Sequence, residues 1–185
     1  MINLLAKSSV ERLIRNGIIA ESERELYNYG VNGLYLSFIN IVTSGIIGIL
    51  FGMLWQSLLF SVAYIPLRSY AGGYHAKTPG RCYFLSTLLI ACVLVVLKYV
   101  PFSMEGMYIA LVIATAVIFV KAPVESENKP LNDRELKMFR TKARKILISE
   151  TLLALILVAA HLSDVAECIL LAILCSAGML ILPEQ

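Results

Sequence analysis

A histidine and a cysteine stand seven residues apart in the segment RSYAGGYHAKTPGRC, residues 68–82, between two strongly apolar stretches. Thr78 and Pro79 predict a helix start there, with Thr78 as the N-cap and Pro79 at the first helical position. Cys82 would then lie in the first turn, where unpaired backbone N–H groups and the helix dipole favour the thiolate, the form that attacks carbonyls. His75 is the natural acceptor of the Cys82 proton. The pair predicts a nucleophilic cysteine.

Each of these residues also has a purely structural explanation. A loop histidine near a membrane surface is often only a polar surface group, and a single cysteine is often a small buried hydrophobe. The same segment contains Gly72 and Gly73, and glycine lets a backbone approach a substrate closely. This combination favours a reactive site over chance placement of two polar residues.

The overall composition decides the class of protein. Hydrophobic residues make up 58% of the 185 residues and charged residues 16%, and the mean hydropathy is +0.77. These values exclude a soluble globular domain and predict an integral membrane protein. The first thirty residues are rich in charge and contain no apolar run of the signal-peptide kind, so we expect the N-terminus to stay in the cytosol.

Hydropathy predicts a single all-α, polytopic membrane domain with about six short transmembrane helices and an N-terminal amphipathic helix. Residues 34–66 are too many for one span and few for two, since a spanning helix needs about 20 residues. We expect a helical hairpin there that turns near Trp55-Gln56-Ser57, with Gly45, Gly48 and Gly52 allowing close packing. The expected order is cytosolic amphipathic helices over 1–30, the hairpin over 34–66, a catalytic loop over 67–82, two spans over 83–120, a basic cytosolic loop over 121–146 and two spans over 147–182.

The distribution of basic residues supports six crossings. If the chain enters from the cytosol and crosses six times, Lys98 is the single Lys or Arg on the outer side. This matches the tendency of basic residues to stay inside, whereas five crossings would place one basic loop outside. Both termini and the 67–82 loop are then cytosolic.

Two cytosolic segments have readable local structure. Apolar residues from Val10 to Ile18, with Gly17 among them, recur at helical spacing opposite charged positions, which predicts an amphipathic helix on the inner leaflet. Asn132 and Glu135 predict a capping box at the start of a basic helix that continues into the fifth span. Topological retention and attraction to anionic lipid would be sufficient to explain that basic helix.

Glu150 is the remaining polar candidate. A carboxylate one turn into a span is costly unless it faces water or a partner, which could be Arg68, or unless it orients His75. Cys92, Cys168 and Cys175 are expected to be packing residues within spans. The spacing of His and Cys predicts no metal site, and we expect no cofactor and no nucleic-acid partner.

The segment that ends at Cys82 combines Arg68, Gly73 and His75, and the segment APVESENKPL follows downstream. Together with the short spans, these features resemble the AgrB (accessory gene regulator protein B) family over most of the chain. These are bacterial membrane cysteine endopeptidases of peptide quorum sensing. The resemblance implies His75 and Cys82 as the catalytic pair, with Arg68 and Gly73 as required neighbours. It also implies a location in the bacterial cytoplasmic membrane.

The same resemblance implies an AgrD-type precursor peptide as substrate. Its acidic C-terminal tail would be removed, and the rest would be closed as a thiolactone or lactone autoinducing peptide intermediate. Gly72, Glu150 and Lys129 are further supporting or substrate-binding candidates. The expected partners are the precursor peptide, the lipid bilayer and a second copy of the chain.

Two other classes stay open from the residues alone. A small helical transporter or channel subunit would need polar residues near the bilayer midplane, and Asn40, Thr43 and Ser44 are the ones available. A non-catalytic membrane adaptor would use only the basic loop. Under either alternative, the substitution Cys82→Ala should not change the activity of the protein.

Overall fold

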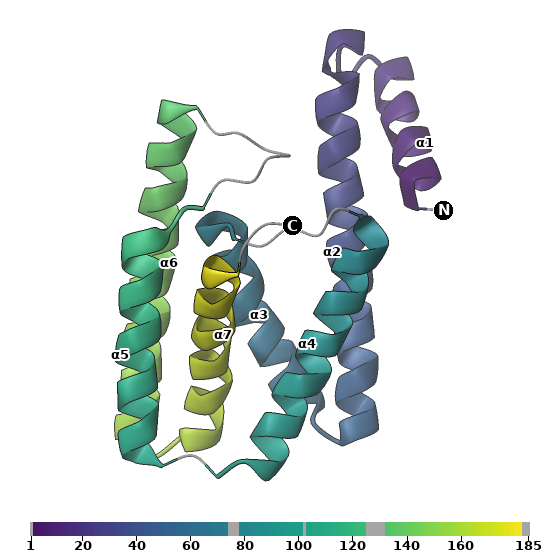
Figure 1. The fold of residues 1–185 in the computed structure, drawn as a ribbon. Coiled ribbons are helices and arrows are strands. Elements are labelled where there is room, and N and C mark those ends of the chain that lie inside the picture. Colours follow the sequence, from purple (N-terminus) through teal and green to yellow (C-terminus); the bar gives the residue numbers. More distant parts are fainter. Residues whose placement is uncertain (1, 74–77, 102, 125–131, 183–185) are drawn as a thin grey trace. The chain divides into compact units, whose positions relative to one another are not determined.

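The fold is all-α, as the composition predicts. The computed structural model describes residues 2–73, 78–101, 103–124 and 132–182. Within these ranges there is no β-strand, and the helices are α1 (Ile2–Arg15), the 3-10 turn η1 (Glu21–Glu23), α2 (Arg24–Phe51), α3 (Leu54–Ala71), α4 (Pro79–Tyr99), α5 (Met104–Lys121), α6 (Asp133–Ala159) and α7 (Ser163–Ile181) (Figure 1). The chain divides into two compact units, Met1–Thr43 and Ser44–Gln185.

The first unit pairs α1 with the beginning of α2. Ala6 and Val10 of α1 are fully buried, and the Ser9 hydroxyl lies 3.0 Å from the Tyr35 hydroxyl. The amphipathic helix is confirmed, but its predicted end is wrong because Gly17 stops it. Gly17 has a φ of +67°, and the Ile18 amide donates to Leu13 O at 3.0 Å. A glycine in the left-handed conformation with this hydrogen bond is a common cap at the C-terminus of an α-helix.

The predicted hairpin exists, but its turn lies elsewhere. The α2 helix ends at Phe51, and Gly52 takes a φ of +70° that residues with a side chain rarely adopt. The Gly52 amide donates to Ile49 O at 3.0 Å, and the Met53 amide donates to Gly48 O at 2.7 Å, the paired bonds of a Schellman cap. Glycine at this position sets the turn, so the prediction of a turn at Trp55-Gln56-Ser57 is wrong.

Ser57 of the predicted turn packs α3 against α2 instead. The Ser57 hydroxyl donates to Ser44 O at 2.6 Å, and the Ser57 residue is fully buried. A Cβ on Gly48 would stand 2.8 Å from the Ser57 Cβ. Gly48 therefore allows the close helix approach that the sequence predicts, whereas Gly52 serves the turn.

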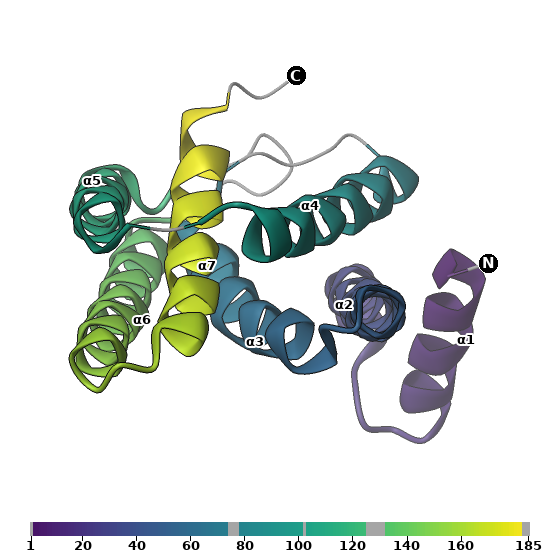
Figure 2. The same ribbon diagram turned by 90° about the horizontal axis from the view of Figure 1, so that it is seen from below.

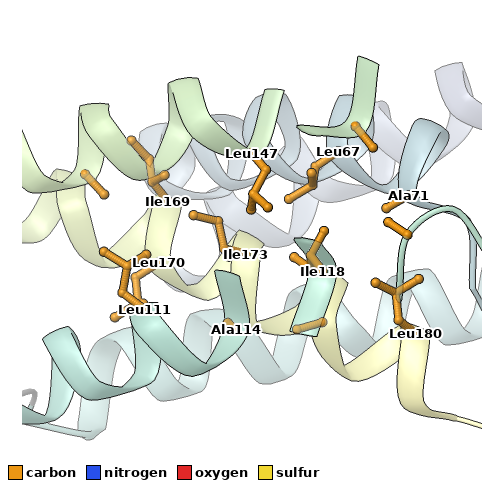
Figure 3. Packing of buried hydrophobic residues seen from close by; sticks show 14 of the residues in the cluster. Leu67, Ala71, Leu111, Ala114, Ile118, Leu147, Ile169, Leu170, Ile173 and Leu180 are labelled. Carbon is orange, nitrogen blue, oxygen red and sulfur yellow. The ribbon is translucent and has the colours of Figure 1, made fainter. Parts of the chain in front are cut away.

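Within the second unit, α7 lies at the centre, between α5 and α6 on one side and α3 and α4 on the other (Figure 2). One apolar cluster joins α3, α5, α6 and α7, where Leu67, Ile118, Leu147 and Ile173 converge (Figure 3). A second cluster joins α3, α4 and the opposite face of α7. Burial on both faces explains why α7 is apolar all round.

Four helices of the described chain are long and apolar enough to cross a membrane: α2 with its preceding turn, α4, α5 and α7. The protein is therefore a polytopic membrane protein. The other two expected spans correspond to α3, which includes Gln56 and Arg68, and α6, whose first half is strongly charged. Their membrane crossing, and with it the count of six, stays a prediction.

Candidate functional site

Cys82 lies where the sequence places it, in the first turn of α4. Thr78 is the N-cap, and its hydroxyl accepts a hydrogen bond from the Arg81 amide at 3.3 Å. Pro79 occupies the first helical position, and the Cys82 amide donates to Thr78 O at 3.1 Å. The Cys82 side chain is half-buried. A thiol in this position experiences the positive end of the helix dipole.

Arg68 belongs to the last turn of α3, so the predicted loop over 67–82 is shorter than expected. The α3 helix continues to Ala71, and α4 already begins at Pro79, because both helices have good local caps. The Arg68 guanidinium donates to Gly72 O, and the Gly72 amide donates to Arg68 O at 3.2 Å. Arg68 thus fixes the first residue after α3.

The glycine pair is held by backbone from two distant segments. Gly72 has a φ of +75° and forms a parallel bridge with Val124, whose amide donates to Ala71 O at 2.9 Å. Gly73 has a φ of +103°, and a Cβ there would stand 2.6 Å from Met179 O. A Cβ on Gly72 would overlap Val124 O. The close approach predicted for these glycines is therefore made to the protein's own backbone.

Tyr64 is a residue of this site that sequence reasoning missed. It lies on α3 one turn before Arg68, is half-buried, and stacks on Phe60 with ring centroids 5.3 Å apart. Its hydroxyl is close enough to both Arg68 and Cys82 to interact with them electrostatically. Tyr64 is thus a common neighbour of residues from α3 and α4. The i, i+4 spacing from Arg68 was the available signal.

The remaining candidates are less well defined by the structure. His75 and Lys129 lie outside the described residues. Glu150 is half-buried on α6, and its Oε2 has no hydrogen-bond partner among the described residues. The ion pairs recorded in the described part of the chain join Arg24 to Glu11 and Glu21, so the expected Glu150–Arg68 pair is not among them.

The other cysteines differ in their surroundings. Cys168 is fully buried, and its thiol donates to Asp164 O at 3.3 Å, as expected of a packing residue. Cys175 is half-buried. Cys92 lies within α4, a candidate span as predicted, but its side chain is exposed, so its predicted role as a packing residue is wrong. The described residues contain no group of three or more His, Cys, Asp or Glu that could hold a metal ion.

The fold and the site define a class: an all-α, polytopic membrane protein with a cysteine in a capped first helical turn. An arginine and two glycines fix the end of the preceding helix. The Accessory gene regulator B (AgrB) family model matches residues 6–180. The chain belongs to this family, which acts with an AgrD-type peptide in quorum sensing.

Individual relatives agree with the family assignment. The chain is 27% identical to an AgrB-like protein of Clostridium perfringens, over 80% of this chain and 72% of the relative. It is 28% identical to protein FsrB of Enterococcus faecalis, over 84% of this chain and 63% of the relative. It is 31% identical to accessory gene regulator protein B of Staphylococcus haemolyticus, over 61% and 58%. No solved structure matches the chain.

Proposed function

We propose that this protein is a membrane cysteine endopeptidase that removes the C-terminal tail of an AgrD-type precursor and promotes cyclisation of the rest to a thiolactone or lactone. The observation that carries the proposal is the position of Cys82 in the capped first turn of α4, ten residues after Gly72, whose carbonyl Arg68 holds. His75 follows Gly73 by two residues and precedes Cys82 by seven in the sequence, and we assign it as the base that takes the thiol proton. Family membership supports the substrate class.

In the first step, His75 takes the Cys82 proton and the thiolate attacks the scissile carbonyl carbon. The tetrahedral intermediate collapses by breaking the C–N bond, and the histidinium gives its proton to the leaving amine. The precursor core then remains attached to Cys82 as a thioester. The tail departs as a free peptide.

In the second step, a thiol or hydroxyl of the precursor attacks this thioester. Its proton passes to His75 as the new C–S or C–O bond forms, and the bond to Cys82 breaks. Attack by a thiol exchanges one thioester for another, so the activated bond is kept, whereas hydrolysis would discard it. A nucleophile held within the same peptide has a large effective concentration over water.

The fold suggests which groups stabilise the oxyanion of the intermediate. The Gly72 amide already donates to Arg68 O, the Arg81 amide to Thr78 Oγ1 and the Cys82 amide to Thr78 O. Proline has no N–H, so Gly80 is the first residue of α4 that can offer an amide. We therefore assign the Gly80 N–H as an oxyanion donor. Gly72 keeps a structural role.

Arg68 acts as a positioning residue in this scheme. By holding Gly72 O, it fixes the backbone three residues before His75. The basic residues of α6, together with Lys129, offer attraction to an acidic tail.

The roles of Glu150 and of a homodimer are further parts of the proposal, and the Glu150→Gln variant distinguishes two roles for the carboxylate. A group that orients His75 affects turnover, whereas one that pairs with Arg68 affects folding.

Co-expression with an AgrD-type precursor tests the proposal. The wild-type protein should yield a core peptide shortened by the tail and lighter by one water when cyclised, as read by mass spectrometry. Cys82→Ala and His75→Ala should each leave the precursor intact while the protein still inserts in the membrane. Cys168→Ala is the matched control, because its thiol is fully buried in α7 and the substitution should leave cleavage in place.

Retained cleavage in Cys82→Ala would remove the peptidase assignment. That result is also what a transporter or an adaptor predicts. Cleavage that yields only the linear core peptide, heavier by one water than the cyclic product, would support the peptidase activity and contradict the cyclisation step.

A further inference from the structure

An apolar groove runs along the outer surface of the α5–α6 pair, away from Cys82. It has a volume of about 400 Å³ and is lined by Tyr108, Val112, Ala116 and Phe119 of α5 and by Thr151 and Leu155 of α6, among others. The Thr115 and Thr151 hydroxyls lie 3.3 Å apart and satisfy each other. The lining therefore presents almost no free polar group, which suits a hydrocarbon chain.

The groove opens to the surroundings of the bundle, not into its core. Val112 is 68% exposed and Val120, at the Phe119 end, is 79% exposed. The α5 and α6 helices lie side by side in both views of the ribbon (Figures 1 and 2). In a membrane protein, such a surface faces lipid.

A cationic side chain stands at the Phe119 end of the groove. The Arg144 guanidinium lies 4.1 Å from the Phe119 ring centroid and donates to Phe119 O at 3.2 Å. Arg144 precedes Thr151 by seven residues, so both lie on one face of α6. Its Nε is buried without a hydrogen-bond partner among the described residues. The guanidinium is thus held against Phe119, which is one of the residues that line the groove.

Further basic residues lie at the same end of the α5–α6 pair as Arg144. Arg140 lies one helical turn earlier on α6 and is exposed, and Lys121 ends α5. The surface is therefore apolar along the groove and cationic at one end. An anionic phospholipid has the same division along its length, with hydrocarbon on one side and a phosphate on the other.

We infer that the α5–α6 groove is a specific site for an anionic phospholipid, with one acyl chain along the groove and the phosphate on Arg144. Charge complementarity selects this occupant over a zwitterionic lipid, because anionic headgroups attract basic side chains at the membrane surface. It also selects lipid over a second copy of the chain, which would bring further basic residues toward Arg144. The inference does not depend on the proposed peptidase activity.

Native mass spectrometry of the full chain in detergent tests the site with two probes, phosphatidylglycerol and phosphatidylcholine of identical acyl chains. The wild-type protein should retain phosphatidylglycerol at least fivefold more strongly. Arg144→Gln should abolish that preference. Arg134→Gln, which removes an exposed charge in the first turn of α6, is the matched control and should keep it.

A second variant tests the groove without touching Arg144. Ala116 is exposed within the lining, so Ala116→Trp should fill the groove without disturbing the core and should lower retention of phosphatidylglycerol at least fivefold. Val95→Trp, exposed on α4 and outside the groove lining, is the control for added bulk. The Ala116→Trp variant tests the lipid site even if Arg144→Gln fails to fold. Circular dichroism shows whether each variant is folded.

Three results would overturn the inference. The first is equal retention of the two lipids by the wild-type protein. The second is unchanged phosphatidylglycerol retention in Ala116→Trp, accompanied by weaker precursor binding, which would make the groove a peptide site. The third is unchanged retention with a loss of dimer, which would make it an interface between copies.

Discussion

Tyr64 gives the sharpest test at the scale of single residues. Its hydroxyl hydrogen-bonds with Arg68, so we expect it to hold the Arg68 side chain in the position that fixes Gly72. Tyr64→Phe removes only the hydroxyl. A hydrogen bond to a charged group contributes about 1.5–3 kcal/mol, so cleavage should slow by about tenfold or more. The decrease should be in kcat, with little change in KM, as measured with a synthetic precursor.

The control for Tyr64→Phe is Tyr70→Phe on the same helix. Tyr70 packs its ring against Phe139 at 5.5 Å and under Lys142 at 4.9 Å, and both contacts need the ring and not the hydroxyl. Its cleavage rate should match that of the wild-type protein. Equal rates in the Tyr64 and Tyr70 variants, at equal thermal stability, would rule out the positioning role.

Cysteine reactivity is a second residue-scale prediction. Iodoacetamide at neutral pH should alkylate Cys82 fastest, because it is half-buried at a helix start with His75 nearby in sequence. Cys168 should react slowest, since it is fully buried. His75→Ala should slow the reaction of Cys82 and leave Cys168 unchanged, as read by peptide mapping. An identical Cys82 rate in His75→Ala would leave His75 without the base role.

At the scale of elements, the glycine pair joins α3 to the ends of α5 and α7. Gly72→Ala should lower the free energy of unfolding by about 2–4 kcal/mol, because it combines a left-handed φ with an overlap on Val124 O. Denaturant unfolding in detergent measures the change. Cleavage should fall as well, since the segment before His75 moves.

Gly178→Ala is the matched control for this substitution. Gly178 lies within α7, is exposed, and a Cβ there would meet nothing within 4 Å. Alanine in a helix interior is more favourable than glycine by about 1 kcal/mol, so this variant should be as stable as the wild-type protein or slightly more so. If Gly72→Ala is equally stable, the bridge to Val124 does not hold the segment.

Local signals predicted the helix starts well. The N-caps at Thr78 and Asn132 were readable because a cap depends on residues three positions apart; the Glu135 amide donates to Asn132 Oδ1 at 2.9 Å. Polar residues are typical of turns, so the sequence favours a turn at Trp55-Gln56-Ser57, whereas the turn forms at Gly52. Ser57, taken as a turn residue, bonds across to Ser44 O, a tertiary contact that no local pattern reports.

At the scale of the whole molecule, composition was enough to predict an all-α membrane protein, and the 68–82 motif was enough to predict that Cys82 lies in the first turn of a helix. The meeting of Gly72 with Val124 and of Gly73 with Met179 could not be predicted. These segments are far apart in sequence and approach only because α3, α5 and α7 pack with their ends aligned. Tyr64 was missed for the same reason, since its electrostatic interaction with Cys82 joins two helices.

The orientation of the bundle in the membrane is the last prediction. Arg144 of α6 contacts Phe119 near the end of α5, and α6 extends beyond that end (Figure 1). Lys137, exposed in the extension, and Glu105, exposed in the first turn of α5, therefore lie at opposite ends of the α5–α6 pair. The excess of basic residues around Lys137 predicts that this end is cytosolic.

Single cysteines at these two positions, in a chain whose own cysteines are replaced, test the orientation. A membrane-impermeant maleimide added to intact cells should label Glu105→Cys and leave Lys137→Cys unlabelled until the cells are permeabilised. Labelling of Lys137→Cys from outside intact cells would show that the orientation is the opposite of the predicted one. It would also place Cys82 on the outer side, because Gly72 and Val124 join the α3–α4 connection to the same end of the bundle as the start of α6.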